Sequence, residues 1–255
     1  MQFIDSHCHI HFDDYPLDAE AVMETAARQN VTRFICSGCT VEDSQKGVDF
    51  ALAHDAVWAT VGLHPHEAQR YIADKSVFEL LEELASRSKV VGIGEIGLDY
   101  HYDNSPRKDQ IQVLEYQLDV AHRLNLPVVL HVREAFDDFW PVFDNFPGLR
   151  GVMHSFTDNR ANLERGLERG LYVGINGIAT FAKDPEQIAV YKTAPLDKIL
   201  LETDAPYLTP VPFRGTICEP KHIVQTAEFL SKLRSEPLEM VAAATTANTE
   251  ALFNI

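Results

Sequence analysis

Residues 3–9 read Phe-Ile-Asp-Ser-His-Cys-His, a short apolar run that ends in two histidines two positions apart. Alternate side chains of a β-strand point to the same face, so His7 and His9 would project together from the end of a strand. Neutral imidazole is the commonest nitrogen ligand of divalent metals in proteins. A chain with 11 histidines contains one such pair readily by chance. The stretch therefore predicts a strand that begins a metal site, provided that other ligands converge on it.

The pattern of a short apolar run followed by a helical segment repeats along the chain. After the first strand we predict seven more, at 33–37, 57–62, 90–94, 128–130, 151–153, 172–175 and 199–202. Apolar residues at helical spacing predict helices at 17–29, 42–54, 77–86, 106–124, 135–143, 159–169 and 185–191, and two more at 221–233 and 237–252 close the chain. Unbroken apolar strands suit a parallel sheet that is buried on both faces. Eight alternations predict an α/β fold, a (β/α)8 TIM barrel with residues 1–255 as a single domain, and a doubly wound open sheet is the alternative.

Metal-ligand side chains stand at the ends of five of these strands. They are His7, His9, Glu95, His131, His154 and Asp204. In a barrel the carboxyl ends of the strands share one rim, where active sites lie. Taken singly, each histidine could be a hydrogen-bonded core residue, Glu95 could bind loop amides, and Asp204 could organise a turn. The coincidence of six such residues at strand ends predicts a metal site.

The number and type of these ligands indicate which metals would bind. A catalytic zinc needs only three protein ligands and a water, so four histidines and two carboxylates suit two divalent ions about 3.5–4 Å apart, bridged by a carboxylate. Mixed nitrogen and oxygen ligands favour Zn, Mn, Co or Ni over Mg. Strand alternation turns Cys8 away from the histidines, so we do not count it as a ligand.

Composition limits the partners and the compartment. The formal net charge of −16 opposes non-specific binding to long duplexes, which depends on Lys and Arg. No apolar run reaches the roughly 20 residues of a membrane span, and no signal peptide is evident. The four cysteines do not form a disulfide framework, and the CxxC at Cys36 and Cys39 is not clearly a redox or zinc motif. We expect a cytoplasmic protein, a monomer or weak oligomer, without a membrane or an obligate protein partner.

The motifs together resemble the TatD family of metal-dependent hydrolases, nearly end to end. The resemblance is carried by residues 3–9, by Val-Gly-Leu-His-Pro-His at 61–66, Gly-Glu-Ile-Gly-Leu-Asp-Tyr at 94–100, Leu-Pro-Val-Val-Leu-His-Val-Arg at 126–133, His-Ser-Phe-Thr at 154–157 and Leu-Glu-Thr-Asp-Ala-Pro-Tyr-Leu-Thr-Pro at 201–210. Such spaced motifs in one order are highly specific. The family is associated with metal-dependent DNase activity, notably 3′–5′ exonuclease action on single strands, and some members with removal of D-amino acids from tRNA.

The resemblance also implies a role for each matching residue. One metal would be held by His7, His9, Glu95 and Asp204, and a second by Glu95, His131 and His154. Asp204 would take a proton from the attacking water. His64 would contact the substrate or transition state, and Arg133 would bind a phosphate or form a structural ion pair.

Two departures from the family pattern lie in loops. In many relatives the loop after the Asp-Ala-Pro-Tyr motif carries a Lys-Arg pair, which is Thr216-Ile217 here, although Arg214 remains. Asp158 replaces a common glycine and adds negative charge where a phosphate would approach. Neither departure affects a metal ligand.

The sequence leaves three functions open. The leading hypothesis is a deoxyribonuclease that acts on nucleic-acid ends by a metal-activated water, with Arg133, Arg214 and Lys221 as cationic contacts. The second is hydrolysis of an amide or ester in a small molecule or an aminoacyl-tRNA, because the same ligands support that chemistry. The third is a metal-binding protein without catalysis.

Overall fold

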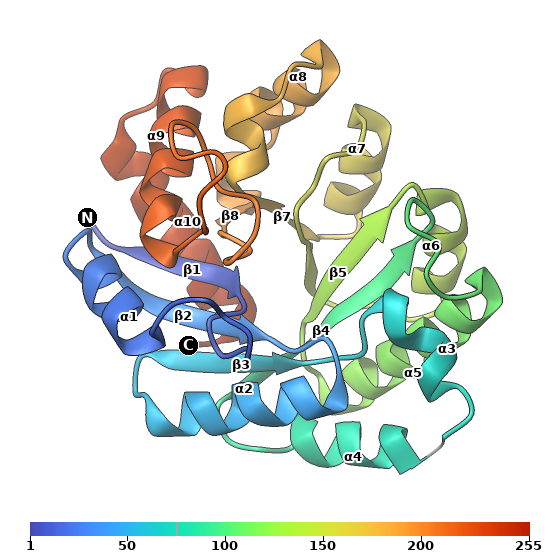
Figure 1. Cartoon of the computed structure of the whole chain (residues 1–255). Coiled ribbons are helices and arrows are strands. Elements are labelled where there is room, and N and C mark those ends of the chain that lie inside the picture. Colours follow the sequence, from blue (N-terminus) through green and yellow to red (C-terminus); the bar gives the residue numbers. More distant parts are fainter. Residues whose placement is uncertain (75) are drawn as a thin grey trace. The chain divides into compact units, whose positions relative to one another are not determined.

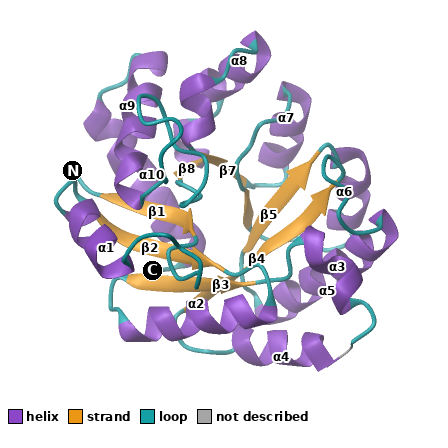
Figure 2. Cartoon of the chain, in the orientation of Figure 1, coloured by secondary structure: helices purple, strands orange, loops and turns teal. Residues whose placement is uncertain are grey.

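The computed structural model describes residues 1–74 and 76–255. It contains eight strands, and their order in the sheet follows the chain from β1 to β8. The strands are β1 (Phe3–Cys8), β2 (Val31–Ser37), β3 (Val57–Val61), β4 (Val90–Asp99), β5 (Val128–Arg133), β6 (Gly151–Met153), β7 (Tyr172–Ile175) and β8 (Ile199–Leu201). All recorded strand pairs are parallel. The order and the intervening helices (Figures 1 and 2) confirm the predicted (β/α)8 TIM-barrel class.

Helices follow the strands along the chain. In the described residues they are α1 (Ala19–Ala27), α2 (Val41–Ala53), α3 (Ala68–Tyr71), α4 (Ser76–Ala85), α5 (Arg107–Leu124), α6 (Phe136–Phe143), α7 (Arg160–Glu168), α8 (Pro185–Thr193), α9 (Ile223–Arg234) and α10 (Leu238–Phe253). Side-chain caps fix several starts. Asp18, Thr40, Asn159 and Asp184 each accept a backbone N–H of the first turn, which satisfies an otherwise unpaired donor. The short helix α3 and the 3-10 turn at Pro65–Glu67 were not predicted, because four residues carry too little periodicity.

The chain divides into two compact units, which we describe separately. The first comprises residues 1–36 and 155–255, and the second residues 37–154. In the first unit β7 pairs with β8 and β1 with β2, while the Ser6 hydroxyl donates to Leu201 O over 2.9 Å and ties β1 to β8. In the second unit β3, β4, β5 and β6 pair in sequence. The single-domain assignment remains a prediction.

Strand β4 is longer than predicted and is irregular at its centre. We expected it to end at residue 94, before the charged Glu95, but it continues to Asp99. Ile93 pairs with Val128 and Ile96 with Leu130, so three residues advance on β4 for two on β5. A bulge of this kind changes the direction in which a side chain points. Glu95 therefore lies within the strand, and a polar residue there does not mark the strand's end.

Gly97 lies where β4 approaches β5 most closely. Its φ is +154°, and a Cβ on this residue would overlap the carbonyl oxygen of His131. We expect Gly97→Ala to lower the free energy of unfolding by about 3 kcal/mol, the upper end of the overpacking range, because the backbones must separate. Gly148→Ala is the control: its φ of +87° is strained, but nothing lies within 4 Å of the added methyl. Urea unfolding should show a clearly smaller loss for Gly148→Ala, and equal losses would contradict the proposed overlap.

Candidate metal centre

The first unit brings His7, His9 and Asp204 together, as the sequence predicted for these three. The two imidazole Nε2 atoms lie 3.1 Å apart. Asp204 Oδ1 lies 3.2 Å from Nε2 of His9 and 3.4 Å from Nε2 of His7. Both histidines are buried. Three lone-pair donors thus approach one point, from β1, from the residue directly after β1 and from the turn after β8, and His7 and His9 project to the same side, as expected.

Asp5, to which the sequence analysis gave no role, positions the turn that carries Asp204. Its buried carboxylate accepts the backbone N–H and the hydroxyl of Thr203, and that hydroxyl accepts the N–H of Ala205. Asp204 itself has a φ of 61°, an unusual value for a non-glycine residue, and donates its N–H to His7 O over 2.9 Å. Burial raises the pKa of Asp5 to about 8, against the opposing effect of these hydrogen bonds. The turn is therefore held by β1, the strand that carries His7 and is followed directly by His9.

In the second unit, three histidines surround Glu95. Its Oε1 lies 2.8 Å from Nδ1 of His131, 3.6 Å from Nε2 of His64 and 3.7 Å from Nε2 of His154. Ligand atoms of His64, Glu95 and His131 all lie within 4.8 Å of one another and could hold an ion. The predicted grouping of Glu95, His131 and His154 is thus present within this unit. His64, expected as a substrate contact, is itself a possible ligand here.

Asp99 completes this cluster and was not predicted as a site residue. Its Oδ2 lies 3.0 Å from Nε2 of His131 and 3.0 Å from Nε2 of His66. Metal-binding histidines commonly donate their second ring N–H to a carboxylate, which fixes the tautomer and raises the basicity of the ligating nitrogen. A hydrogen bond from His131 Nε2–H to Asp99 would direct the Nδ1 lone pair toward Glu95. Asp99 is therefore a positioning residue for His131.

The electrostatics of this cluster favour a positive charge at His131. Desolvation by itself would lower the pKa of His131, but its hydrogen bonds to Asp99 and Glu95 outweigh that effect and raise the pKa to about 9. Desolvation, followed by the neighbouring His131, lowers the pKa of His64 to about 4. The pKa of Asp99 falls below its usual range because the hydrogen bonds from His131 and His66 outweigh its burial. A divalent cation can take the place of a proton between Glu95 and His131, since metal binding requires a deprotonated imidazole.

The spacing of the donors also fits a transition metal. A tetrahedral ion bound at about 2.0–2.1 Å separates neighbouring ligand atoms by roughly 3.3–3.4 Å. The three separations among His7, His9 and Asp204 are 3.1, 3.2 and 3.4 Å. Nitrogen donors in the majority suit Zn, Mn, Co or Ni better than Mg. Each unit therefore holds a donor group that is suited to such an ion.

Asp99→Asn tests the positioning role of Asp99. The amide preserves the shape but cannot accept equally well from both imidazoles, so we expect metal affinity and metal-dependent turnover to fall about 10-fold to 100-fold. The exposed Asp103→Asn substitution, in the same loop, is the control. Isothermal titration with Zn or Mn measures the affinity. Equal affinities for the two variants would contradict the role assigned to Asp99.

The predicted cationic contacts differ in their surroundings. Arg133 lies with its guanidinium carbon 4.8 Å from the ring centroid of Tyr102, and within residues 1–74 and 76–255 we find no carboxylate paired with it. Arg214 is stacked 3.7 Å from the ring centroid of Phe181 and donates to Thr209 O over 3.4 Å. The ammonium of Lys221 is paired with Glu219. Of the three, only Lys221 is paired with a carboxylate in the described residues, and Arg133 lies on the strand that carries His131.

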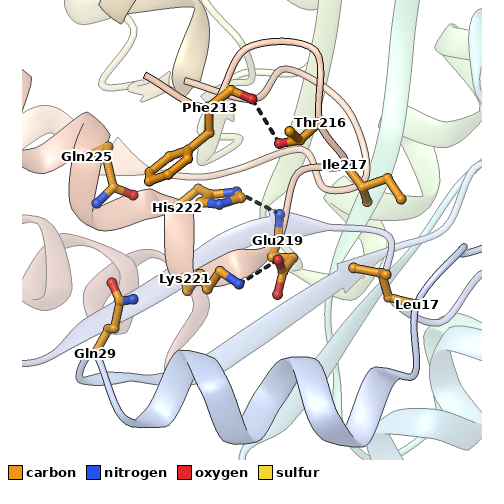
Figure 3. Close-up of a pocket in the computed structure, with 9 residues that line it drawn as sticks. All are labelled: Leu17, Gln29, Phe213, Thr216, Ile217, Glu219, Lys221, His222 and Gln225. Atoms are coloured by element: carbon orange, nitrogen blue, oxygen red, sulfur yellow. Dashed lines mark hydrogen bonds and ion pairs between the residues drawn. The ribbon is translucent and has the colours of Figure 1, made fainter. Parts of the chain in front are cut away.

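The loop that departs from the family pattern lines a cavity of about 400 Å³ in the first unit (Figure 3). Thr216 and Ile217 form part of its wall, beside the Glu219–Lys221 ion pair. Phe213 stacks on His222 with ring centroids 5.0 Å apart. Among its described side chains, the wall of this cavity carries no cation without a carboxylate partner, and Arg214 of the same loop is not part of that wall. Asp158 instead accepts from the N–H of Asn159 and the amide of Asn162 at the start of α7.

The cysteines are free thiols in the described residues. Cys8 donates to Ile35 O over 3.6 Å, which agrees with its predicted direction away from the histidines. Cys36 is buried in β2, and Cys39 lies with its sulfur 3.8 Å from Glu95 Oε2. The CxxC motif therefore forms no disulfide, and its second cysteine borders the Glu95 cluster. Across the described residues, no helix has the length and apolarity needed to span a membrane.

A (β/α)8 barrel that carries clusters of histidines and carboxylates within its strands and directly after them is typical of one class of protein, the metal-dependent hydrolases. Comparison with known proteins gives the particular family. The family model described as "TatD related DNase" matches residues 4–254. The chain is 33% identical to the metal-dependent hydrolase YabD of Bacillus subtilis, over 98% of each protein. The chain belongs to the TatD family, as the sequence motifs predicted.

Two further comparisons are informative about structure and activity. The crystal structure of YjjV, a TatD homologue from Escherichia coli, superposes with a TM-score of 0.92 at 32% identity, over 99% of this chain and 98% of that one. A relative from Shigella flexneri, named as the 3′-5′ ssDNA/RNA exonuclease TatD, is 33% identical over 93% of this chain and 94% of its own length. The protein described here is therefore a metal-dependent hydrolase of this family.

Proposed function

We propose that the protein is a metal-dependent phosphodiesterase, a deoxyribonuclease that removes nucleotides from the 3′ ends of single strands. The relative named as a 3′-5′ exonuclease supports this substrate class. One observation in the structure carries the proposal. Strand β5 bears His131 and Arg133 two positions apart, so both side chains leave the same face of the strand, and Arg133 has no carboxylate partner in the described residues. A free guanidinium beside a metal-binding imidazole suits a phosphate group.

We further propose that the six predicted ligands bind two divalent ions. Divalent ions, when bound, lower the pKa of water toward 7 and neutralise charge on the phosphoryl oxygens. His7, His9 and Asp204 would supply the donors of the first unit, and Glu95, His131 and His154 those of the second. Asp204 would accept the proton of the attacking water. Arg133 would orient the phosphate and stabilise its growing negative charge.

Hydrolysis of an amide or ester is the second candidate, since the donor set supports both reactions. It is favoured over a non-catalytic role because Asp204, the proposed proton acceptor, lies against both histidines of the first cluster. Nucleic acid would be distinguished by salt dependence, because each neutralised phosphate of a single strand steepens the fall in affinity with salt by about 0.7 in a double-logarithmic plot.

The experiment that tests the proposal uses protein stripped of metal. Mn, Co, Zn, Ni or Mg is added back singly, with single-stranded DNA labelled at the 5′ or the 3′ end as substrate. We expect stepwise shortening of the 5′-labelled strand and immediate release of the 3′ label with at least one of the first four metals. A protein that binds metal but leaves both strands intact would disprove the nuclease assignment. Amides, esters and aminoacyl-tRNA would then be tested.

His64 could be a substrate contact or a metal ligand, and a substitution distinguishes these two roles. A substrate or transition-state contact predicts that His64→Asn lowers kcat by about 10²–10³-fold with unchanged metal affinity, the range seen for a lost transition-state donor. We expect this result because the family resemblance assigns His64 to the substrate, and with a pKa of about 4 the neutral imidazole can donate or accept a hydrogen bond. His122→Asn, which changes an exposed histidine of α5 in the same unit, is the control. Metal titration that shows a large loss of affinity for His64→Asn would instead make His64 a ligand.

A further inference from the structure

Tyr102 is an exposed aromatic residue close to the Glu95 cluster in the second unit. It follows β4, and 57% of its surface is exposed. The guanidinium of Arg133 lies 4.8 Å from its ring centroid. The rings of His66 and His101 stand nearly perpendicular to it, at centroid distances of 5.5 and 4.9 Å. The ring is therefore supported by its neighbours but is not covered by them.

The backbone of Tyr102 is tied to the carboxylate that positions His131. Asp99 Oδ1 accepts the N–H of Tyr102 over 2.9 Å and the N–H of His101 over 3.0 Å. The other oxygen, Oδ2, faces Nε2 of His131 at 3.0 Å. One buried side chain thus holds both the start of the Tyr102 loop and an imidazole of the metal cluster. A group bound on Tyr102 would be held in a fixed relation to that cluster.

We propose that Tyr102 and Arg133 form a nucleotide subsite, in which the tyrosine ring stacks on a nucleobase and the guanidinium binds an adjacent phosphate. This inference rests on the proposed function and names the recognition element for its substrate. Aromatic rings bind unpaired bases through their faces, and they do so with little sequence preference because every base has such a face. The subsite selects single strands, since a paired base cannot leave its stack without an energetic cost. It requires a base but not a particular one.

The test compares oligonucleotides that carry an abasic residue at one of the last three positions with the intact strand. For the wild-type protein, we expect one abasic position to raise KM roughly 10-fold to 100-fold, as for loss of one base stack, with kcat changed less. Tyr102→Ala should show this raised KM on the intact strand and no further penalty at that position. Tyr102→Phe retains the ring and should behave as wild type. Tyr172→Ala, another tyrosine with a cation 4.6 Å from its ring, is the control.

Arg133 gives an independent readout. Arg133→Gln should lower the slope of log KM against log salt concentration by about 0.7, the value for one phosphate contact on a single strand. Tyr102→Ala should leave this slope unchanged. A Tyr102→Ala protein that keeps the wild-type KM and the wild-type abasic penalty would overturn the subsite while leaving the nuclease function intact. So would a loss of metal affinity in Tyr102→Ala, since Tyr102 would then be structural. A wild-type protein that cleaves no oligonucleotide would remove both proposals together.

Discussion

Glu95→Gln should abolish metal-dependent turnover and weaken metal binding in the same preparation. Glu95 Oε1 lies within 3.7 Å of three imidazoles, so this carboxylate is the point on which the second cluster converges. The glutamine side chain has nearly the same volume, but it offers one neutral carbonyl oxygen in place of the two oxygens of a charged carboxylate. Partners of a ligand typically contribute 10-fold to 100-fold to affinity or activity. A carboxylate that is itself a metal ligand and lies beside three histidines should contribute more than this to affinity and activity. We therefore expect kcat/KM to fall more than about 100-fold.

The matched control is Glu134→Gln, an exposed carboxylate 2.7 Å from His101 in the same unit. Metal content by mass spectrometry, metal titration and turnover on labelled single-stranded DNA would be measured for both variants. Thermal unfolding without metal shows that the variant protein is folded. The expected pattern is a joint loss of metal and turnover in Glu95→Gln alone. Loss of turnover with full metal content would mean that Glu95 acts on the substrate and is not a ligand.

Much of the fold was predictable because parallel strands that are buried on both faces consist of short apolar runs. Strands β6 and β7 were predicted at their observed bounds, since each is closed by a polar or turn-forming residue. Strand β4 was predicted five residues too short, because Glu95 resembled an end. The bulge opposite Val128 and Leu130 depends on how two strands pair, and no local pattern reports it. Glu95 was thus correctly singled out, but on the wrong premise that it follows the end of β4.

The candidate metal ligands could be picked out from the sequence, but the residues that orient them were harder to find. His7 and His9 are recognisable as a pair because strand alternation directs them to one side. Asp99 could have been found, since it lies four residues after Glu95 and the sequence has a second histidine pair at 64 and 66. The sequence does not show that one oxygen of Asp99 contacts both His66 and His131, because these three residues are far apart in the chain. Asp5 is a similar case, 198 positions from Thr203.

Asp204→Asn should separate proton transfer from folding in the first unit. Asp204 faces both histidines through Oδ1, and Asp5 holds its turn through contacts with Thr203 that do not involve the Asp204 side chain. Asparagine keeps that turn and tolerates the positive φ of 61° well. The amide cannot accept a proton from water. We therefore expect kcat to fall about 10²–10⁴-fold, the usual contribution of general base catalysis, while the unfolding temperature changes little.

The comparison that makes this result specific is Asp5→Asn. Asp5 accepts hydrogen bonds from Thr203 and has no proposed part in the chemistry, so this variant should lose stability as well as activity. Loss of a buried hydrogen-bond acceptor costs about 1–3 kcal/mol. Thermal unfolding and single-turnover kinetics on labelled DNA distinguish the two variants. If Asp204→Asn unfolds as early as Asp5→Asn, Asp204 is part of the scaffold, and the attacking water must lose its proton to another group. If Asp204→Asn stays folded and slow, the turn after β8 serves to present one carboxylate to His7 in β1 and to His9 directly after it. The strained φ of Asp204 is then explained by its function.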